Sequence, residues 1–322
     1  ALVAASARVA GGDALAAGLA TVQPVGRFDA EARVVRNQRG QWTWNTTLSP
    51  RTLQATIGEA RPTLAFDGVG NVRIGPGAVA FDRLRATVDG GTVGFNGALS
   101  LAPSLNTLNG TLSIDARRLS DAIAAFLPEP LKSAQRELAF SADELDIPDA
   151  RLRVEWQPSL GITTPDVYRL DTTLNTRGGS FSVGLPLQGV DGSATIAFAL
   201  ESGTSEPRYT LNASMESTQL RVFDREMRDG RAAIELAPDG RTIVVRQFEG
   251  SIADGRLAGD ARLDTASNRF AADVRLSDAR LDPLIDPTAV GPNARNSKGT
   301  VDARLSIEGI TDDVQTRTGR GR

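Results

Sequence analysis

The sequence contains no cysteine and no histidine. Without cysteine the chain has neither disulfides nor thiol chemistry. Without histidine it lacks the commonest metal ligand and the usual general base near neutral pH. An enzyme built from this chain would have to work with carboxylates and hydroxyl groups alone. We therefore expect no catalytic residue, no metal site and no cofactor.

A charge excess of one sign is also missing, since the formal net charge is −3 at pH 7. Basic and acidic residues are interspersed along the chain, so we expect no nucleic-acid partner. Lys132 and Lys298 are the only lysines, and arginine supplies the remaining positive charge. We interpret this preference as a consequence of genomic base composition rather than as a phosphate-binding signal.

No segment approaches the ~20 apolar residues that a helix needs to span a bilayer. The first residues also lack the basic region and apolar core of a secretion signal. The chain begins with Ala1, and residues 318–322 resemble the start of another turn and strand. We therefore expect a fragment of a longer protein whose membrane anchor lies outside these residues.

Motifs for nucleophilic catalysis and phosphate binding are absent: there is no Gly-x-Ser-x-Gly and no Gly-Lys-Ser/Thr phosphate loop. The densest acidic group is Asp143, Glu144, Asp146 and Asp149. Its spacing lacks the central glycine and terminal glutamate of a calcium loop. We interpret this group as a solvated loop.

Residues 248–284 contain the unit that most of the chain repeats. Asp254-Gly255 predicts a tight hairpin turn, because glycine adopts positive φ at little cost. After the turn, apolar and polar residues alternate over residues 257–263 and again over 270–276, as in half-buried strands. Residues 277–284 then leave the sheet through the start of a helix. The unit is a β-meander with one apolar face.

The unit recurs at residues 81–101, with Asp89-Gly90-Gly91 at the turn, and continues into a strand at residues 108–116. A helix over residues 119–127 follows, with Ser120 as its N-cap. A third and less regular copy predicts a turn at Asp229-Gly230.

Other segments predict further elements outside these copies. Residues 14–19 predict a short helix, and Trp42 and Trp44 lie on one face of a predicted strand, where we expect them to pack against the sheet. Residues 286–297 predict a loop, and residues 301–307 a last strand.

Strands with one apolar face need neighbouring strands, and irregular repeat spacing favours a long sheet over a propeller. The predicted fold class is mainly β: an elongated, curved antiparallel β-sheet built from repeated meanders, with short helices at the rim. We expect residues 1–322 to form a single extended region, with a weak internal boundary near residues 120–149.

Strands, turns with Asp-Gly or Gly-Gly, and exits of the type Ala-Arg-Leu-Asp together resemble the AsmA-like family of bacterial envelope proteins. The matching segments are residues 88–93, 114–119, 252–259 and 274–281, whereas residues 1–22 fit poorly. The resemblance implies a non-enzymatic, bridge-like lipid-transfer groove of repeated β-sheets. It also implies a periplasmic location, a tether to the inner membrane, an extension toward the outer membrane, and a role in phospholipid transport and outer-membrane integrity.

An uncovered apolar sheet face would expose more than the few hundred Å² that soluble monomers tolerate, unless phospholipid acyl chains cover it. The residues that we expect to line such a groove are Phe95, Leu99, Leu112, Ile114, Phe198, Leu257, Val274, Leu276, Val301 and Leu305. The alternative is a structural β-sandwich scaffold, or an adhesion or interaction module, in which the apolar faces pack against each other without ligand.

Overall fold

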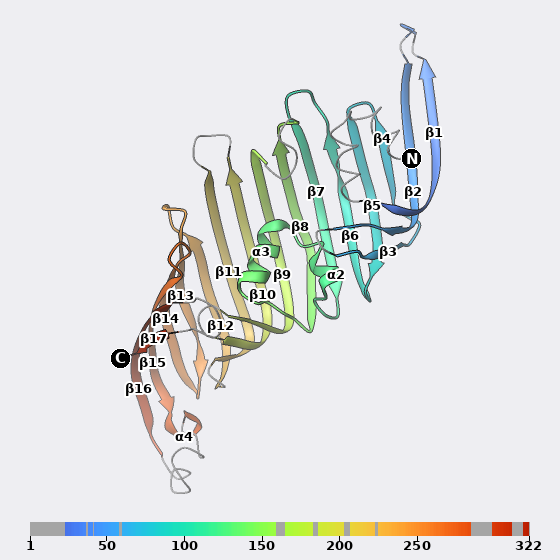
Figure 1. The fold of residues 1–322 in the computed structure, drawn as a ribbon. Helices are drawn as coiled ribbons and strands as arrows, with labels where there is room; N and C mark the ends of the chain where they lie inside the picture. Colours follow the sequence, from blue (N-terminus) through green and yellow to red (C-terminus); the bar gives the residue numbers. More distant parts are fainter. Residues whose placement is uncertain are drawn as a thin grey trace. The chain divides into compact units, whose positions relative to one another are not determined.

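The computed structural model describes residues 23–36, 38–40, 42–57, 60–158, 165–182, 186–202, 207–222, 225–284, 298–310 and 318–321. In these residues the chain is mainly β, with strands β1 to β17 and the short helices α2, α3 and α4 (Figure 1). The predicted fold class, an antiparallel sheet of meanders with short helices at the rim, is confirmed. The helix predicted over residues 14–19 and the loop predicted over residues 286–297 lie outside the described residues.

The chain divides into two compact units, which contain different parts of the meander. Unit 1 comprises Ala1–Lys132, Leu145–Thr173 and Phe198–Arg208, and unit 2 comprises Ser133–Glu144, Leu174–Ala197 and Tyr209–Arg322. Strands β9 (Val167–Ser182) and β10 (Pro186–Glu201) contribute residues to both units. Within the segment 120–149, residues 133–144 therefore belong to unit 2 and the flanking residues to unit 1.

Unit 1 contains a meander whose strands pair in antiparallel fashion. Strand β2 pairs with β1 and also with β3 and β4, both of which pair with β5; the strands then pair in chain order from β5 to β8. The elements are β1 (Val25–Arg36), β2 (Trp42–Gln54), β3 (Thr63–Phe66), β4 (Asn71–Gly75), β5 (Ala78–Val88), β6 (Gly91–Ser100), β7 (Asn106–Ala116), α2 (Asp121–Ala124) and β8 (Glu144–Trp156).

Unit 2 contains a second meander in which each strand from β11 to β17 pairs with the next. Its elements are β11 (Arg208–Val222), β12 (Arg225–Leu236), β13 (Thr242–Ile252), β14 (Gly255–Asp264), β15 (Arg269–Arg280), α4 (Leu281–Leu284), β16 (Thr300–Ile310) and β17 (Thr318–Gly321). Helix α3 (Glu129–Glu137) begins in unit 1 and ends in unit 2.

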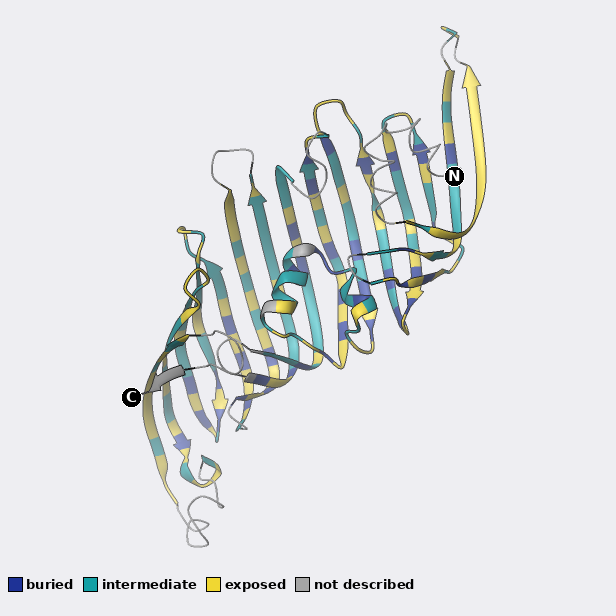
Figure 2. Cartoon of the chain, in the orientation of Figure 1, coloured by how far each residue is buried: buried dark blue, intermediate teal, exposed yellow. Residues whose placement is uncertain are grey.

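The predicted period of two is confirmed in both units. Val93 lies opposite Ile114, and Leu257 lies opposite Leu276, so each apolar residue meets an apolar partner on the neighbouring strand. Directly opposed residues share a face of the sheet. Figure 2 shows the result as bands of buried and exposed residues along the strands.

The hairpin between β13 and β14 turns one residue earlier than predicted. Ala253 and Asp254 have φ of 50° and 61°, the signs that a type I′ turn requires at both central positions. Gly255 is instead the first residue of β14. A Cβ atom on Gly255 would lie 2.4 Å from the Cα atom of Ala279, so glycine is required there by close backbone approach rather than by positive φ.

The hairpin between β5 and β6 has the same arrangement. Asp89 and Gly90 occupy the turn with φ of 46° and 77°, and Gly91 is the first residue of β6. A Cβ atom on Gly91 would lie 3.0 Å from Cβ of Ala116 and from Cδ1 of Ile123. Both hairpins therefore place a glycine just after the turn, where the end of the neighbouring strand packs closely against it.

The predicted turn at Asp229-Gly230 is wrong, because β12 continues through these residues. The register with β13 shifts between Arg228 and Arg231, and Asp229 has φ of 52°. These are the features of a β-bulge. The Asp-Gly dipeptide misled the prediction because positive φ suits the extra residue of a bulge as well as a hairpin turn.

Bulges of this kind recur in β5, β13 and β15, where Arg83, Gln247 and Asp278 have positive φ. The N–H of Asp278 donates to Oδ1 of Asp302 at 3.0 Å, and the N–H of Arg83 donates to Oδ1 of Asn96 at 3.4 Å. A side chain of the opposing strand thus accepts the hydrogen bond that the ladder loses. Bulges bend the strand and increase its twist.

The two kinds of glycine can be separated by substitution. We expect Gly255→Ala to lower the free energy of unfolding by roughly 3 kcal/mol, because its Cβ meets backbone atoms of β15. Gly90→Ala should cost only about 1 kcal/mol, since nothing lies within 4 Å of its Cβ and only the positive φ is unfavourable. Urea unfolding of both variants measures the difference. Equal losses would show that the turn register is wrong.

Candidate functional site

One face of the sheet in unit 1 is apolar from β2 to β8. The register places these side chains together because directly opposed residues point to the same side. We call this set the unit-1 apolar face; its main members are Leu48, Val72, Ile74, Val79, Phe81, Leu84, Val93, Phe95, Leu99, Leu108, Leu112, Ile114, Ile147, Leu152 and Val154.

Helix α2 covers one end of the unit-1 apolar face. Its Ile123 is fully buried, and the Cβ position of Gly91 lies 3.0 Å from its side chain. The predicted N-cap is confirmed, since Oγ of Ser120 accepts a hydrogen bond from the N–H of Ile123 at 3.4 Å. Ile114 lies at this closed end and is only 1% exposed.

The rest of the unit-1 apolar face packs sideways, strand against strand. Phe95 lies directly opposite Leu112, and its ring meets that of Phe81 edge to face, with centroids 5.3 Å apart. Leu99 belongs to a buried cluster with Ile74, Val79, Val154 and Trp156. Phe95 and Phe81 are only half-buried.

Phe198 comes from β10 and contacts Tyr168 of β9, with ring centroids 6.1 Å apart in an edge-to-face arrangement. Like Phe95, Phe198 is half-buried. Unit 1 thus contains five of the residues predicted to line a groove. Two of these, Phe95 and Phe198, keep part of their surface exposed.

The unit-2 apolar face is built in the same way. Leu257 lies opposite Leu276, which lies opposite Ala303, and Val274 lies opposite Leu305. Val301 lies opposite Ala279 on the same face, beyond the bulge of β15. The remaining predicted residues, which are Leu257, Val274, Leu276, Val301 and Leu305, are therefore together on one face, as the sequence predicted.

Burial decreases across the unit-2 apolar face toward β16. Leu220 and Met227 are fully buried, Leu257 is 9% exposed, and Leu305 is 38% exposed. Val274 and Leu276 are half-buried and pack against the cluster around Leu220. The face is thus closed near β11 and β12 and open toward β16.

A side chain of β12 helps to hold helix α4 over the closed end of unit 2. The guanidinium of Arg225 donates to the carbonyl oxygens of Pro283 at 3.0 Å and Leu284 at 3.1 Å, and Leu284 packs against the buried cluster. Sequence reasoning did not single out Arg225, because it reaches across more than fifty residues and no local pattern signals such a contact.

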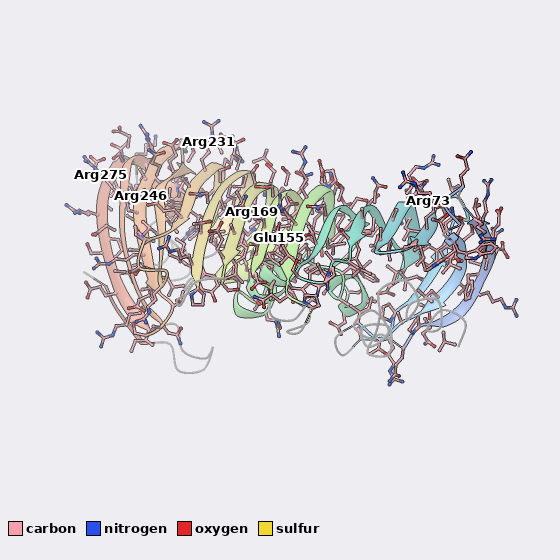
Figure 3. The ribbon with its side chains drawn as sticks, turned by 90° about the horizontal axis from the view of Figure 1, so that it is seen from above. Arg73, Glu155, Arg169, Arg231, Arg246 and Arg275 are labelled. Atoms are coloured by element: carbon pink, nitrogen blue, oxygen red, sulfur yellow. The ribbon has the colours of Figure 1, made fainter. Side chains whose placement is uncertain are left out.

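The opposite face of the sheet is polar in both units. Arg169 pairs with Glu201 at 2.9 Å in unit 1, and Arg246 pairs with Glu235 at 2.6 Å in unit 2. Figure 3 labels further members of this face, which the register places opposite to the apolar side: Arg73, Glu155, Arg231 and Arg275. The side chains of both ion pairs are exposed, so this face is the water-facing side. Exposed ion pairs contribute little stability.

The acidic group at residues 143–149 was predicted to be a solvated loop, and this is wrong from Glu144 onward, where β8 begins. Leu145 and Ile147 are buried and alternate with the acidic residues, a period of two that the charges obscured. Glu144 pairs with Arg177 at 3.1 Å, and Asp149 pairs with Arg151 at 3.4 Å.

Two carboxylates of unit 2 have a lowered pKa because they accept hydrogen bonds at turns. The hydroxyl of Thr242 and backbone N–H groups lower the pKa of Asp239, and the N–H groups of Ser267 and Ala266 lower the pKa of Asp264. Asp239 is exposed and lies between β12 and β13, and Asp264 is the half-buried last residue of β14. Among the described residues, no three His, Cys, Asp or Glu side chains converge to hold a metal ion.

Comparison with protein-family models, with curated proteins and with solved structures finds no match. In the described part of the chain, no helix has both the length and the apolar character to cross a membrane. The function is therefore inferred from the two apolar faces and from the sequence pattern.

Side chains in the closed and in the open parts of the apolar faces should respond differently to replacement by alanine. We expect Ile123→Ala to cost about 3 kcal/mol of unfolding free energy, because this side chain of α2 is fully buried. Leu305→Ala should cost less than about 1 kcal/mol, since Leu305 is already 38% exposed. Thermal and urea unfolding provide both values. A large loss at Leu305 would mean that the face is covered at β16.

Proposed function

We propose that this chain is a non-enzymatic lipid-binding and lipid-transfer protein that holds phospholipid acyl chains on the open parts of its apolar faces. One observation carries the proposal. Each apolar face is covered at one end by a short helix or its flanking turn, and no second sheet covers the remainder among the described residues.

Acyl chains match the chemistry of these faces. The half-buried side chains around Phe95 and Leu276 are aliphatic or aromatic and offer no hydrogen-bonding group, so a polar ligand would gain nothing there. A methylene chain gains about 0.8 kcal/mol for each buried CH₂ group. The lipid headgroup would remain in water beside the polar rim.

The resemblance to the AsmA-like family gives this activity a cellular setting. We propose a periplasmic protein that is anchored in the inner membrane by residues outside this chain and extends toward the outer membrane. Its phospholipid transport would support outer-membrane integrity. The second candidate is a scaffold or interaction module, which the buried clusters around Val154 and Leu220 favour because they need no ligand.

Leu276→Asp tests the lipid proposal. Leu276 is half-buried, so the variant should stay folded with a lower melting temperature, whereas a charge on the apolar face should reduce bound phospholipid at least about tenfold. Arg275→Asp is the matched control, because it introduces the same carboxylate at the neighbouring position on the polar face. Native mass spectrometry of the purified chains measures bound lipid, and circular dichroism measures folding.

A photo-crosslinking residue at position 276 should capture phospholipid in cells, and the same residue at position 275 should not. Leu220→Asp serves as the folding reference, since Leu220 is fully buried and its replacement should unfold unit 2. If wild-type chain carries no phospholipid and Leu276→Asp unfolds as Leu220→Asp does, the scaffold replaces the lipid groove.

A further inference from the structure

Three turns of unit 1 lie side by side along one rim of its sheet (Figure 1). They join β1 to β2 (residues 36–42), β4 to β5 (residues 75–78) and β6 to β7 (residues 100–106), and each connects two strands that pair with each other. The second and third turns are adjacent, because the N–H of Leu101 donates to the carbonyl oxygen of Gly77 at 2.7 Å. The first turn lies beside the second, because β2 pairs with β4.

The described residues of these turns expose apolar side chains. Trp42 is 66% exposed and Leu105 is 36% exposed. We call this set of exposed residues the Trp42 rim; its members are Arg36, Trp42, Pro76, Ala102, Pro103 and Leu105. The buried cluster that contains Leu99 and Trp156 lies just inside the Trp42 rim. The turns therefore rest on a packed part of the sheet.

The charge on the Trp42 rim has one sign. The guanidinium of Arg36 lies over the ring of Trp42, with its carbon 5.6 Å from the ring centroid, and its Nε donates to the carbonyl oxygen of Gly40 at 3.1 Å. Arg39 belongs to the same turn. No described residue of the three turns is acidic. An anionic surface would therefore meet only positive charge on this rim.

The opposite rim of unit 1 differs in composition. Asp89 and Asp121 lie there together with Arg117 and Arg118, so carboxylates offset the guanidinium charge. Tryptophan rings are enriched at the level of lipid headgroups, where one part of the ring is apolar and the N–H stays in water. Basic side chains close to a membrane are attracted by anionic lipids. The Trp42 rim has both features, and the opposite rim has mixed charge.

We propose that the Trp42 rim docks on the surface of a bilayer that contains anionic phospholipid. Trp42 and Leu105 enter the headgroup layer, and Arg36 stays at the level of the phosphate groups. The chain itself makes this contact, which is distinct from an anchor outside these residues. The docking surface also differs from the apolar faces proposed to hold acyl chains, so it does not depend on lipid bound there.

Vesicle flotation tests the proposal on the 322-residue chain. The chain should bind vesicles of phosphatidylcholine and phosphatidylglycerol in equal amounts more tightly than vesicles of phosphatidylcholine, and binding should weaken as salt rises. Tryptophan emission should shift to shorter wavelength on binding. Trp42→Phe should keep binding and lose most of this shift, because Trp44 is half-buried and Trp156 is buried in the sheet.

Two substitutions on different turns should weaken binding, each at least about fivefold. Arg36→Glu replaces an attraction to anionic lipid by a repulsion, and Leu105→Asp places a carboxylate in the headgroup layer. Arg118→Glu is the matched charge control, because this exposed arginine lies on the opposite rim. Val69→Asp is the matched apolar control, because Val69 is 60% exposed between β3 and β4, away from the rim. Both controls should bind like wild type.

Circular dichroism should show all variants folded, and if one rim variant unfolds, the other decides. Failure of wild type to bind vesicles that contain phosphatidylglycerol would overturn the proposal and leave the rim to a protein partner. Equal weakening by Arg36→Glu and Arg118→Glu would also overturn it, because net charge alone would then explain binding. So would a full emission shift in Trp42→Phe. Phospholipid that copurifies with the chain is measured separately by native mass spectrometry and decides only the acyl-chain proposal.

Discussion

The backbone hydrogen-bond ladder is the interaction on which this structure depends. In a sandwich or a helical bundle, apolar side chains are held by a facing layer, but the described strands of each unit have no facing sheet. The apolar side chains therefore pack sideways, as Phe81 and Phe95 do across β5 and β6. The ladder places these neighbours together, and lateral packing then strengthens the ladder.

A sheet held in this way needs closed ends, and the two units make them with related parts. Each has a type I′-like hairpin followed by a glycine that permits close approach, Gly91 in unit 1 and Gly255 in unit 2. Each meander then leaves the sheet through a short helix, α2 or α4. The most deeply buried side chains, such as Ile123 and Leu220, lie in or near these ends. A further buried cluster around Leu99 and Val154 lies on the unit-1 apolar face, at the other end of β6 from Gly91.

The two faces of the sheet have opposite characters in both units. Ion pairs such as Arg246 with Glu235 keep the polar face in water at little energetic gain. The apolar face has a surface that water solvates poorly. This asymmetry is the physical basis for proposing acyl chains as ligands.

Most strands, and the residues that share a face, could be predicted from the sequence, because alternation with a period of two is a local property. Phe95 with Leu112, and Leu257 with Leu276, were placed together on this basis, and the register agrees. Where charges interrupted the apolar pattern, as at residues 144–149, the strand was missed. Positive φ was expected at the glycine of Asp254-Gly255, but Ala253 and Asp254 have it instead, and the bulge at Asp229 was not distinguished from a turn.

Which parts of the apolar faces are closed depends on tertiary contacts that the sequence pattern does not contain. Ile114 and Leu305 have the same place in the alternating pattern and were predicted to line one groove, yet Ile114 is 1% exposed and Leu305 is 38% exposed. Burial depends on contacts between residues far apart in the chain, such as Arg225 with the carbonyl groups of α4, which pattern alone does not report. Periodicity reports the direction of a side chain, whereas burial depends on what the rest of the chain places in front of it.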